Sequence, residues 1–93
     1  MSVTGQPNSE PTRVGTSIGD ITAGLFTTIG INAALYDREK TGKGTFIDVS
    51  MLDCQIAILE NAIARYLSKN EIPKPMGSRH PSIAPFEAFK TKD

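Results

Sequence analysis

A long stretch without a charged residue, from Ile21 to Tyr36, constrains this chain more than any other feature. Its apolar residues leave no wide polar face, so the sequence predicts a helix over residues 20–40 that is buried on several sides. Gly24 and Gly30 each cost about 1 kcal/mol relative to Ala inside a helix, which predicts close packing of another backbone against them. The rest of the sequence has too few apolar elements to cover such a helix.

Asp20 directly precedes this stretch. Backbone N–H groups at a helix N-terminus favour a negative charge, so an acid at this position stays ionised. One interpretation is that Asp20 caps the helix, and another is that it is an isolated reactive carboxylate. Because Asp is a common cap before an apolar run, the residues alone favour capping.

Composition excludes several classes of function. The 93 residues allow one domain at most, and ten basic against ten acidic residues leave no basic patch for nucleic acid. The only cysteine, Cys54, and the only histidine, His80, predict neither an internal disulfide nor a metal site. The uncharged stretch contains Thr, Gly and Asn and is shorter than a membrane span. We therefore expect a soluble cytoplasmic protein that binds no membrane.

Glycine, proline and β-branched residues mark the other elements of the first half. Residues 1–19 are rich in small and turn-forming residues, which predicts a loop. Gly42-Lys43-Gly44 ends the helix and begins a turn, because a phosphate-binding loop needs the reverse order of elements and a third glycine. Thr45–Val49 is β-branched and aromatic, which predicts a short strand.

A second helix is predicted from Ser50 to about Lys69. Ser50 and Asp53 have the spacing of a capping box, so Asp53 is interpreted as structural. An apolar stripe with helical spacing follows, made of Leu52, Ile56, Leu59, Ile63 and Tyr66. Cys54 lies on this helix without a nearby His, which favours an inert side chain over a nucleophile.

Four prolines between residues 70 and 85 predict an extended loop that contains Gly77 and His80. His80 either faces solvent or belongs to a loop over an active site. Phe86–Phe89 is predicted to be a last strand.

Several motifs, in this order, resemble family III CoA-transferases. They are Arg13-Val14-Gly15 through Gly19-Asp20, Ala33 through Gly44, Ile47 through Asp53, Gly77 through Pro81, and Ala84 through Asp93. That family includes formyl-CoA transferase, carnitine CoA-transferase, succinyl-CoA-dependent dicarboxylate CoA-transferases and α-methylacyl-CoA racemase. The resemblance covers almost all of this chain but only an internal part of a complete member.

The resemblance implies a role for Asp20 that reverses the capping interpretation. In the transferases the matching Asp is the nucleophile, and it forms an aspartyl-CoA thioester before an acceptor acid completes the exchange. Coenzyme A thioesters and carboxylic acids are then substrates, and no cofactor is bound permanently. The loop with Gly77 and His80 matches the place of a substrate-shaping loop, although it has no run of consecutive glycines.

The resemblance also implies an α/β fold: a Rossmann-like parallel sheet and a smaller second domain, in an interlocked homodimer. The chain is then a partial domain over residues 1–93: a loop (1–19), helix–strand–helix (20–69), and a loop and strand (70–93). Such a fragment is expected to be inactive alone. Two alternatives are an acyl-CoA racemase, in which the same Asp pairs with an upstream His as an acid/base group, and a non-catalytic helical interaction module.

Overall fold

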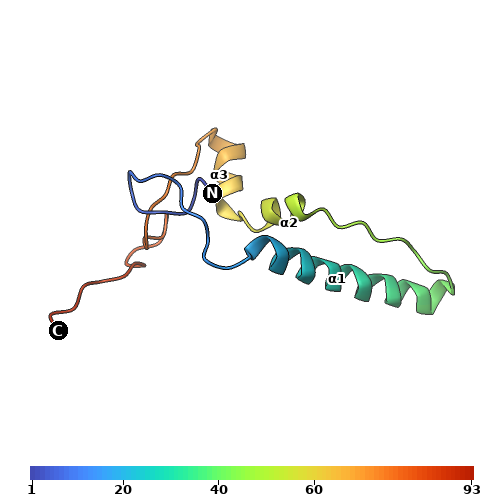
Figure 1. The fold of residues 1–93 in the computed structure, drawn as a ribbon. Helices are drawn as coiled ribbons and strands as arrows, with labels where there is room; N and C mark the ends of the chain where they lie inside the picture. Colours follow the sequence, from blue (N-terminus) through green and yellow to red (C-terminus); the bar gives the residue numbers. More distant parts are fainter. The chain divides into compact units, whose positions relative to one another are not determined.

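The computed structural model describes all 93 residues and contains three helices, α1 (Ile18–Thr41), α2 (Met51–Ala57) and α3 (Asn61–Lys69) (Figure 1). The chain divides into two compact units. One unit is Thr16–Ile63, and the other combines Met1–Gly15 with Ala64–Asp93.

Helix α1 extends slightly beyond its predicted bounds at both ends. Ser17 occupies the N-cap position without a side-chain cap hydrogen bond, so Asp20 is the third residue of the helix and not its cap. At the other end Gly42 has a left-handed φ of 68°, and its N–H donates to the carbonyl of Arg38 at 2.8 Å. A left-handed residue of this kind is a common helix terminator, so the predicted end at Gly42 is confirmed.

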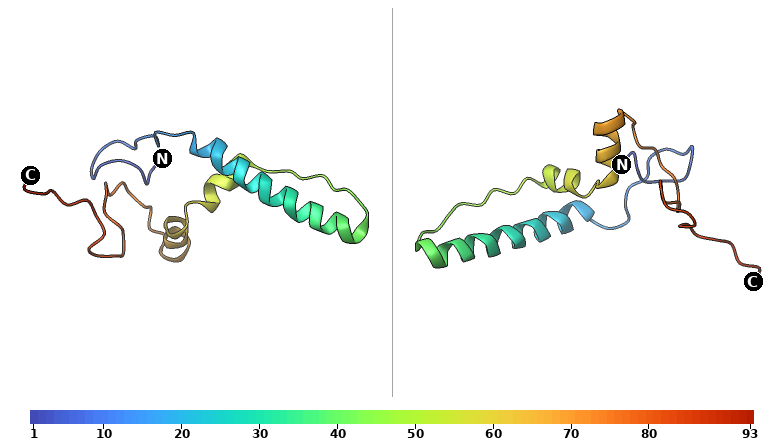
Figure 2. Two further views of the ribbon diagram at one scale, coloured as in Figure 1. Left: turned by 90° about the horizontal axis from the view of Figure 1, so that it is seen from below. Right: turned by 180° about the vertical axis from the view of Figure 1, so that it is seen from behind.

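The chain returns from Gly42 as an extended segment that runs back beside α1 and leads into α2 (Figure 2). A Cβ built on Gly30 would lie 3.1 Å from Cγ2 of Ile47, so this glycine permits a close approach. Gly24 has no atom of another segment within 4 Å of the same position. The predicted close packing therefore occurs at Gly30, against a side chain, and not at Gly24.

The structure contains no β-strand, so the predicted α/β fold with its helix–strand–helix–loop–strand order is wrong. Residues 45–49 are extended but make no backbone–backbone hydrogen bond. In residues 86–89 the one such bond is from the His80 N–H to the Phe86 carbonyl, at 2.9 Å. β-Branched and aromatic residues favour an extended backbone, but a strand also needs a paired neighbour, which neither segment has.

The second predicted helix is interrupted. Ser50 caps α2 as predicted, because its hydroxyl accepts a hydrogen bond from the Asp53 N–H at 3.2 Å. The helix then ends at Ala57, and α3 begins only at Asn61. Glu60, between them, has a positive φ of 46°, which a continuous helix does not allow.

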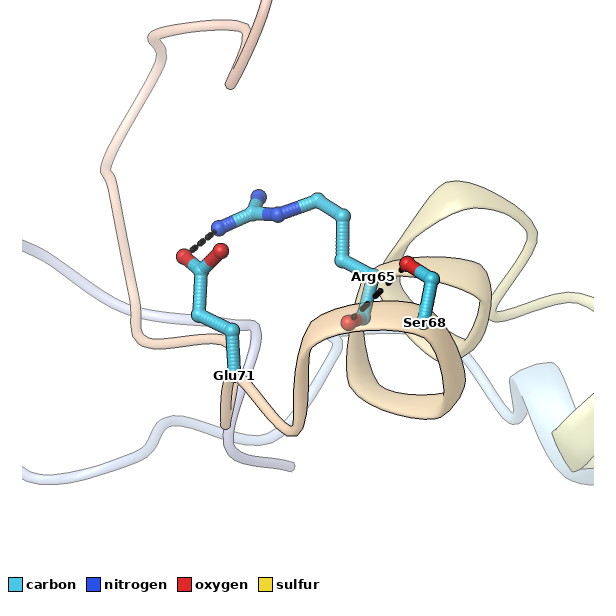
Figure 3. A network of polar contacts seen from close by, with 3 residues as sticks. All are labelled: Arg65, Ser68 and Glu71. Atoms are coloured by element: carbon cyan, nitrogen blue, oxygen red, sulfur yellow. Dashed lines mark hydrogen bonds and ion pairs between the residues drawn. The ribbon is translucent and has the colours of Figure 1, made fainter.

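The unit formed by Met1–Gly15 and Ala64–Asp93 consists of the last part of α3 and of segments without helix or strand. The Arg65 guanidinium donates a hydrogen bond to the Glu71 carboxylate, across the end of α3 (Figure 3). Within the same helix the Ser68 hydroxyl donates to the Arg65 carbonyl at 3.5 Å. These contacts are local and exposed.

Few side chains are buried. Only Thr22 on α1 and Cys54 on α2 are less than a tenth exposed, at 5% each. Most apolar residues of α1 are exposed, among them Leu25, Ile29 and Tyr36. By length and composition α1 would be able to cross a membrane, but the core helix of a soluble protein meets the same criteria.

Candidate active site

Asp20 projects from the first turn of α1 and is exposed. The structure contains two ion pairs, Arg65–Glu71 and Arg79–Glu87, so no cation neutralises Asp20. The unpaired N–H groups at the start of α1 stabilise a negative charge here. Asp20 is therefore an accessible carboxylate without an ion-pair partner at the N-terminal end of α1.

The opposite side of this turn is packed against α2. A Cβ built on Gly19 would lie 3.7 Å from Sδ of Met51 and 3.8 Å from Cδ of Gln55. Thr22 is one turn further along, and residues three apart share a helix face, whereas residues one or two apart do not. Gly19 and Thr22 thus face α2, and Asp20 lies on another side of the same turn.

A hydrogen-bond chain crosses this contact. Nε2 of Gln55 donates to Oγ1 of Thr22 at 2.7 Å. Oγ1 of Thr22 lies 2.8 Å from the Ile18 carbonyl, to which it donates, and 3.1 Å from the Gly19 carbonyl. The buried hydroxyl of Thr22 therefore joins α2 to the backbone of the turn that carries Asp20.

Cys54 is buried in α2, next to Gln55 in the sequence. A buried thiol is shielded from substrate, and its burial supports the interpretation of Cys54 as an inert side chain.

His80 lies in the other unit, where it organises its own loop. Its Nδ1 accepts hydrogen bonds from the N–H groups of Ser82, at 3.2 Å, and Ile83, at 3.0 Å. The ring meets the Phe86 ring edge-on, with centroids 5.3 Å apart. Because Nδ1 acts as an acceptor, the proton of a neutral His80 lies on Nε2. A hollow of about 240 Å³ is lined by Arg79, His80, Pro81, Ser82, Ile83, Ala84, Phe86 and Glu87.

The backbone conformation at residue 77 requires a glycine. Its φ is 65°, and its N–H donates to the Gly5 carbonyl at 2.9 Å. A Cβ at this position would lie 2.9 Å from Oε1 of Gln6. Gly77 therefore joins the loop of residues 70–85 to the N-terminal loop of the same unit.

No group of three or more His, Cys, Asp or Glu side chains is placed to hold a metal ion. The two candidate residues of the sequence analysis, Asp20 and His80, belong to different units.

The model of a known protein family, CoA-transferase family III, matches residues 1–93, the whole chain. The chain belongs to CoA-transferase family III. Among curated members of the family, the chain is 47% identical to acetyl-CoA:oxalate CoA-transferase of Acetobacter aceti over 94 aligned positions. It is 43% identical to human succinyl-CoA:glutarate CoA-transferase, and 34% identical to succinyl-CoA:mesaconate CoA-transferase of Haloarcula hispanica, over 93 positions each.

Each of these matches spans all of this chain but only 24%, 21% and 24% of the respective relative. A crystal structure of a CAIB/BAIF family protein from Brucella suis is 42% identical, with a TM-score of 0.84. That match covers 94% of this chain and 23% of the Brucella chain. The chain therefore spans about a quarter of the length of its relatives.

Sequence reasoning singled out Asp20 as a candidate but missed the two side chains that join its turn to α2. Thr22 and Gln55 are 33 positions apart, so no local pattern relates them. The available signal was weak: each is a polar side chain on a helix whose neighbours are mainly apolar.

Proposed function

We propose that the intact protein containing this segment is an acyl-CoA:carboxylate CoA-transferase in which Asp20 is the nucleophile. The observation that carries the proposal is the exposed, unpaired carboxylate of Asp20 in the first turn of α1. The curated relatives support it, because those named above exchange coenzyme A between carboxylic acids according to their names.

The reaction proceeds in steps in which either a thioester or an anhydride is always present. The Asp20 carboxylate attacks the thioester carbonyl of the donor, which gives a mixed anhydride and releases the CoA thiolate. The thiolate attacks the Asp20 carbonyl, which gives an aspartyl-CoA thioester and the free donor acid. The acceptor carboxylate and then the released thiolate repeat these steps in reverse, which yields the new acyl-CoA and regenerates Asp20. Covalent catalysis divides one difficult transfer into easier steps.

The proposal extends to the surroundings of the reaction. The loop of Gly77 and His80 shapes the substrate site, and coenzyme A thioesters are substrates and not permanent cofactors. The intact protein is a cytoplasmic homodimer. These points rest on the family resemblance. The exposed apolar side chains of α1 add support for the dimer only because they need another surface to cover them.

The test is the kinetics of Asp20→Asn in the intact protein. This change removes the anionic oxygen and almost preserves shape, so the variant should fold and bind CoA but lose at least about a thousandfold in kcat, as removal of a nucleophile does. Asp37→Asn is the matched control, because Asp37 is an exposed acid at the other end of α1. That control should retain wild-type turnover.

Two results would contradict the proposal. Full turnover by Asp20→Asn, with deamidation excluded by mass, would show that Asp20 is not the nucleophile. Exchange of the substrate α-proton with solvent, without CoA transfer, would identify a racemase whose acid only moves a proton.

A further inference from the structure

The contact between α1 and α2 contains the buried side chain of Thr22 and lies at the turn that bears Asp20. We propose that Gln55 is a positioning residue that fixes this turn through its hydrogen bond to Thr22. The inference rests on the proposed function of Asp20.

The geometry links Gln55 to Asp20 through the backbone. Gln55 donates to Thr22 at 2.7 Å, and Thr22 in turn donates to the Ile18 carbonyl two residues before Asp20. The Gln55 amide also lies against Gly19, the residue directly before Asp20. These contacts involve Ile18 and Gly19 before Asp20 and Thr22 after it, and the carboxylate of Asp20 is exposed.

Burial makes this bond specific. Thr22 is 5% exposed, and a buried hydroxyl without its partners is costly, so the Thr22–Gln55 pair favours one relative placement of α1 and α2. Position matters for a nucleophile, because a displacement of about 1 Å is able to lower a rate about a hundredfold. Gln55 therefore affects the chemical step without touching the substrate.

The test uses two near-isosteric variants of the intact enzyme, Gln55→Met and Thr22→Val. Each removes the hydrogen bond and keeps the packing volume. We expect each to lower kcat, and the single-turnover rate of acylation at Asp20, by about tenfold, with KM for the acyl-CoA unchanged. Because both changes break the same bond, the double variant should lose no more than either single one.

Two further variants separate positioning from folding. Thr22→Ser keeps the hydroxyl and should restore kcat. Thr28→Val is the matched control, because Thr28 is exposed and its hydroxyl bonds only to Gly24 of its own helix; its kcat should equal that of the wild type. Gln55 is only half-buried, so Gln55→Met carries the test if Thr22→Val fails to fold.

A lower melting temperature with wild-type kcat per folded molecule would overturn the inference, and so would a raised KM with unchanged kcat. These outcomes are distinct from failure of the proposed function. If Asp20→Asn is inactive but Gln55→Met is fully active, only the positioning role is lost. If Asp20→Asn is active, the nucleophile itself is misassigned.

Discussion

The two ends of α1 differ in how they are held. At the N-terminal end, Thr22 is buried and Gly19 lies against α2. Towards the C-terminal end, Ile29 is 63% and Tyr36 is 66% exposed. The difference shows that the packing within this segment is concentrated at the turn that carries the candidate nucleophile, while most of the helix is left uncovered.

Uncovered apolar surface should dominate the behaviour of the isolated segment. We predict that residues 1–93 alone have no CoA-transfer activity and are oligomeric or poorly soluble, because α1 exposes many large apolar side chains. Size-exclusion chromatography with light scattering, together with an activity assay, checks this. A monodisperse monomer with cooperative thermal unfolding would show that the exposed end of α1 needs no cover.

The end of α1 at Gly42 should be sensitive to substitution. In the intact protein, Gly42→Ala should lower the free energy of unfolding by about 1–2 kcal/mol, because Gly42 has a left-handed φ of 68°. Gly44→Ala is the control, since no atom lies within 4 Å of the new Cβ and Gly44 has no positive φ. Denaturant unfolding measures both, and equal effects would show that the left-handed turn does not set this end of the helix.

Two N-cap residues near the packed end of α1, Ser50 and Ser17, should differ in their contributions to stability. Ser50→Ala should cost about 1 kcal/mol in stability, because its hydroxyl accepts from the Asp53 N–H. Ser17→Ala should cost less, because Ser17 makes no side-chain cap bond to α1. Thermal unfolding of the two variants checks the order. A larger loss at Ser17 would mean that α1, and not α2, depends on its cap.

The smallest effect is expected at Glu71. The hydrogen bond from Arg65, with the positive charges of Arg65 and Lys69, lowers the pKa of Glu71. A lowered pKa in the folded state stabilises the fold above the unfolded pKa, and that contribution is lost as the pH falls through the folded pKa. The Glu71→Gln variant should therefore be less stable than wild type at neutral pH, and the two stabilities should converge in acid. Because the pair is exposed, the difference should also shrink in high salt. A difference that grows in acid would contradict the assigned pair.

Much of the helical part of this fold could be predicted from the sequence. The uncharged stretch gave α1, and Gly42 and Ser50 marked a helix end and a helix start, because each acts through its own backbone or hydroxyl. The break before α3 was missed, since the apolar stripe continues through it and Glu60 gives no sign of a positive φ. The predicted strands were wrong because residue type favours extension without supplying a partner strand.

The candidate site was predictable only in part. Asp20 was singled out because it stands alone before an apolar stretch, and its catalytic role came from the family resemblance. The bond between Thr22 and Gln55 depends on how α1 and α2 pack, and no spacing along the chain encodes it. Local signals thus singled out Asp20 as a candidate, and only the three-dimensional packing showed which side chains join its turn to α2.

The most direct measurement is to trap the covalent intermediate. The intact protein is incubated with an acyl-CoA donor, treated with hydroxylamine and digested with trypsin, and the peptide of residues 14–38 is sequenced by mass spectrometry. This peptide also contains Asp37, which serves as an internal control. We predict an aspartyl hydroxamate on Asp20 and none on Asp37. Turnover with an unmodified Asp20, or with the adduct on another residue, would contradict it.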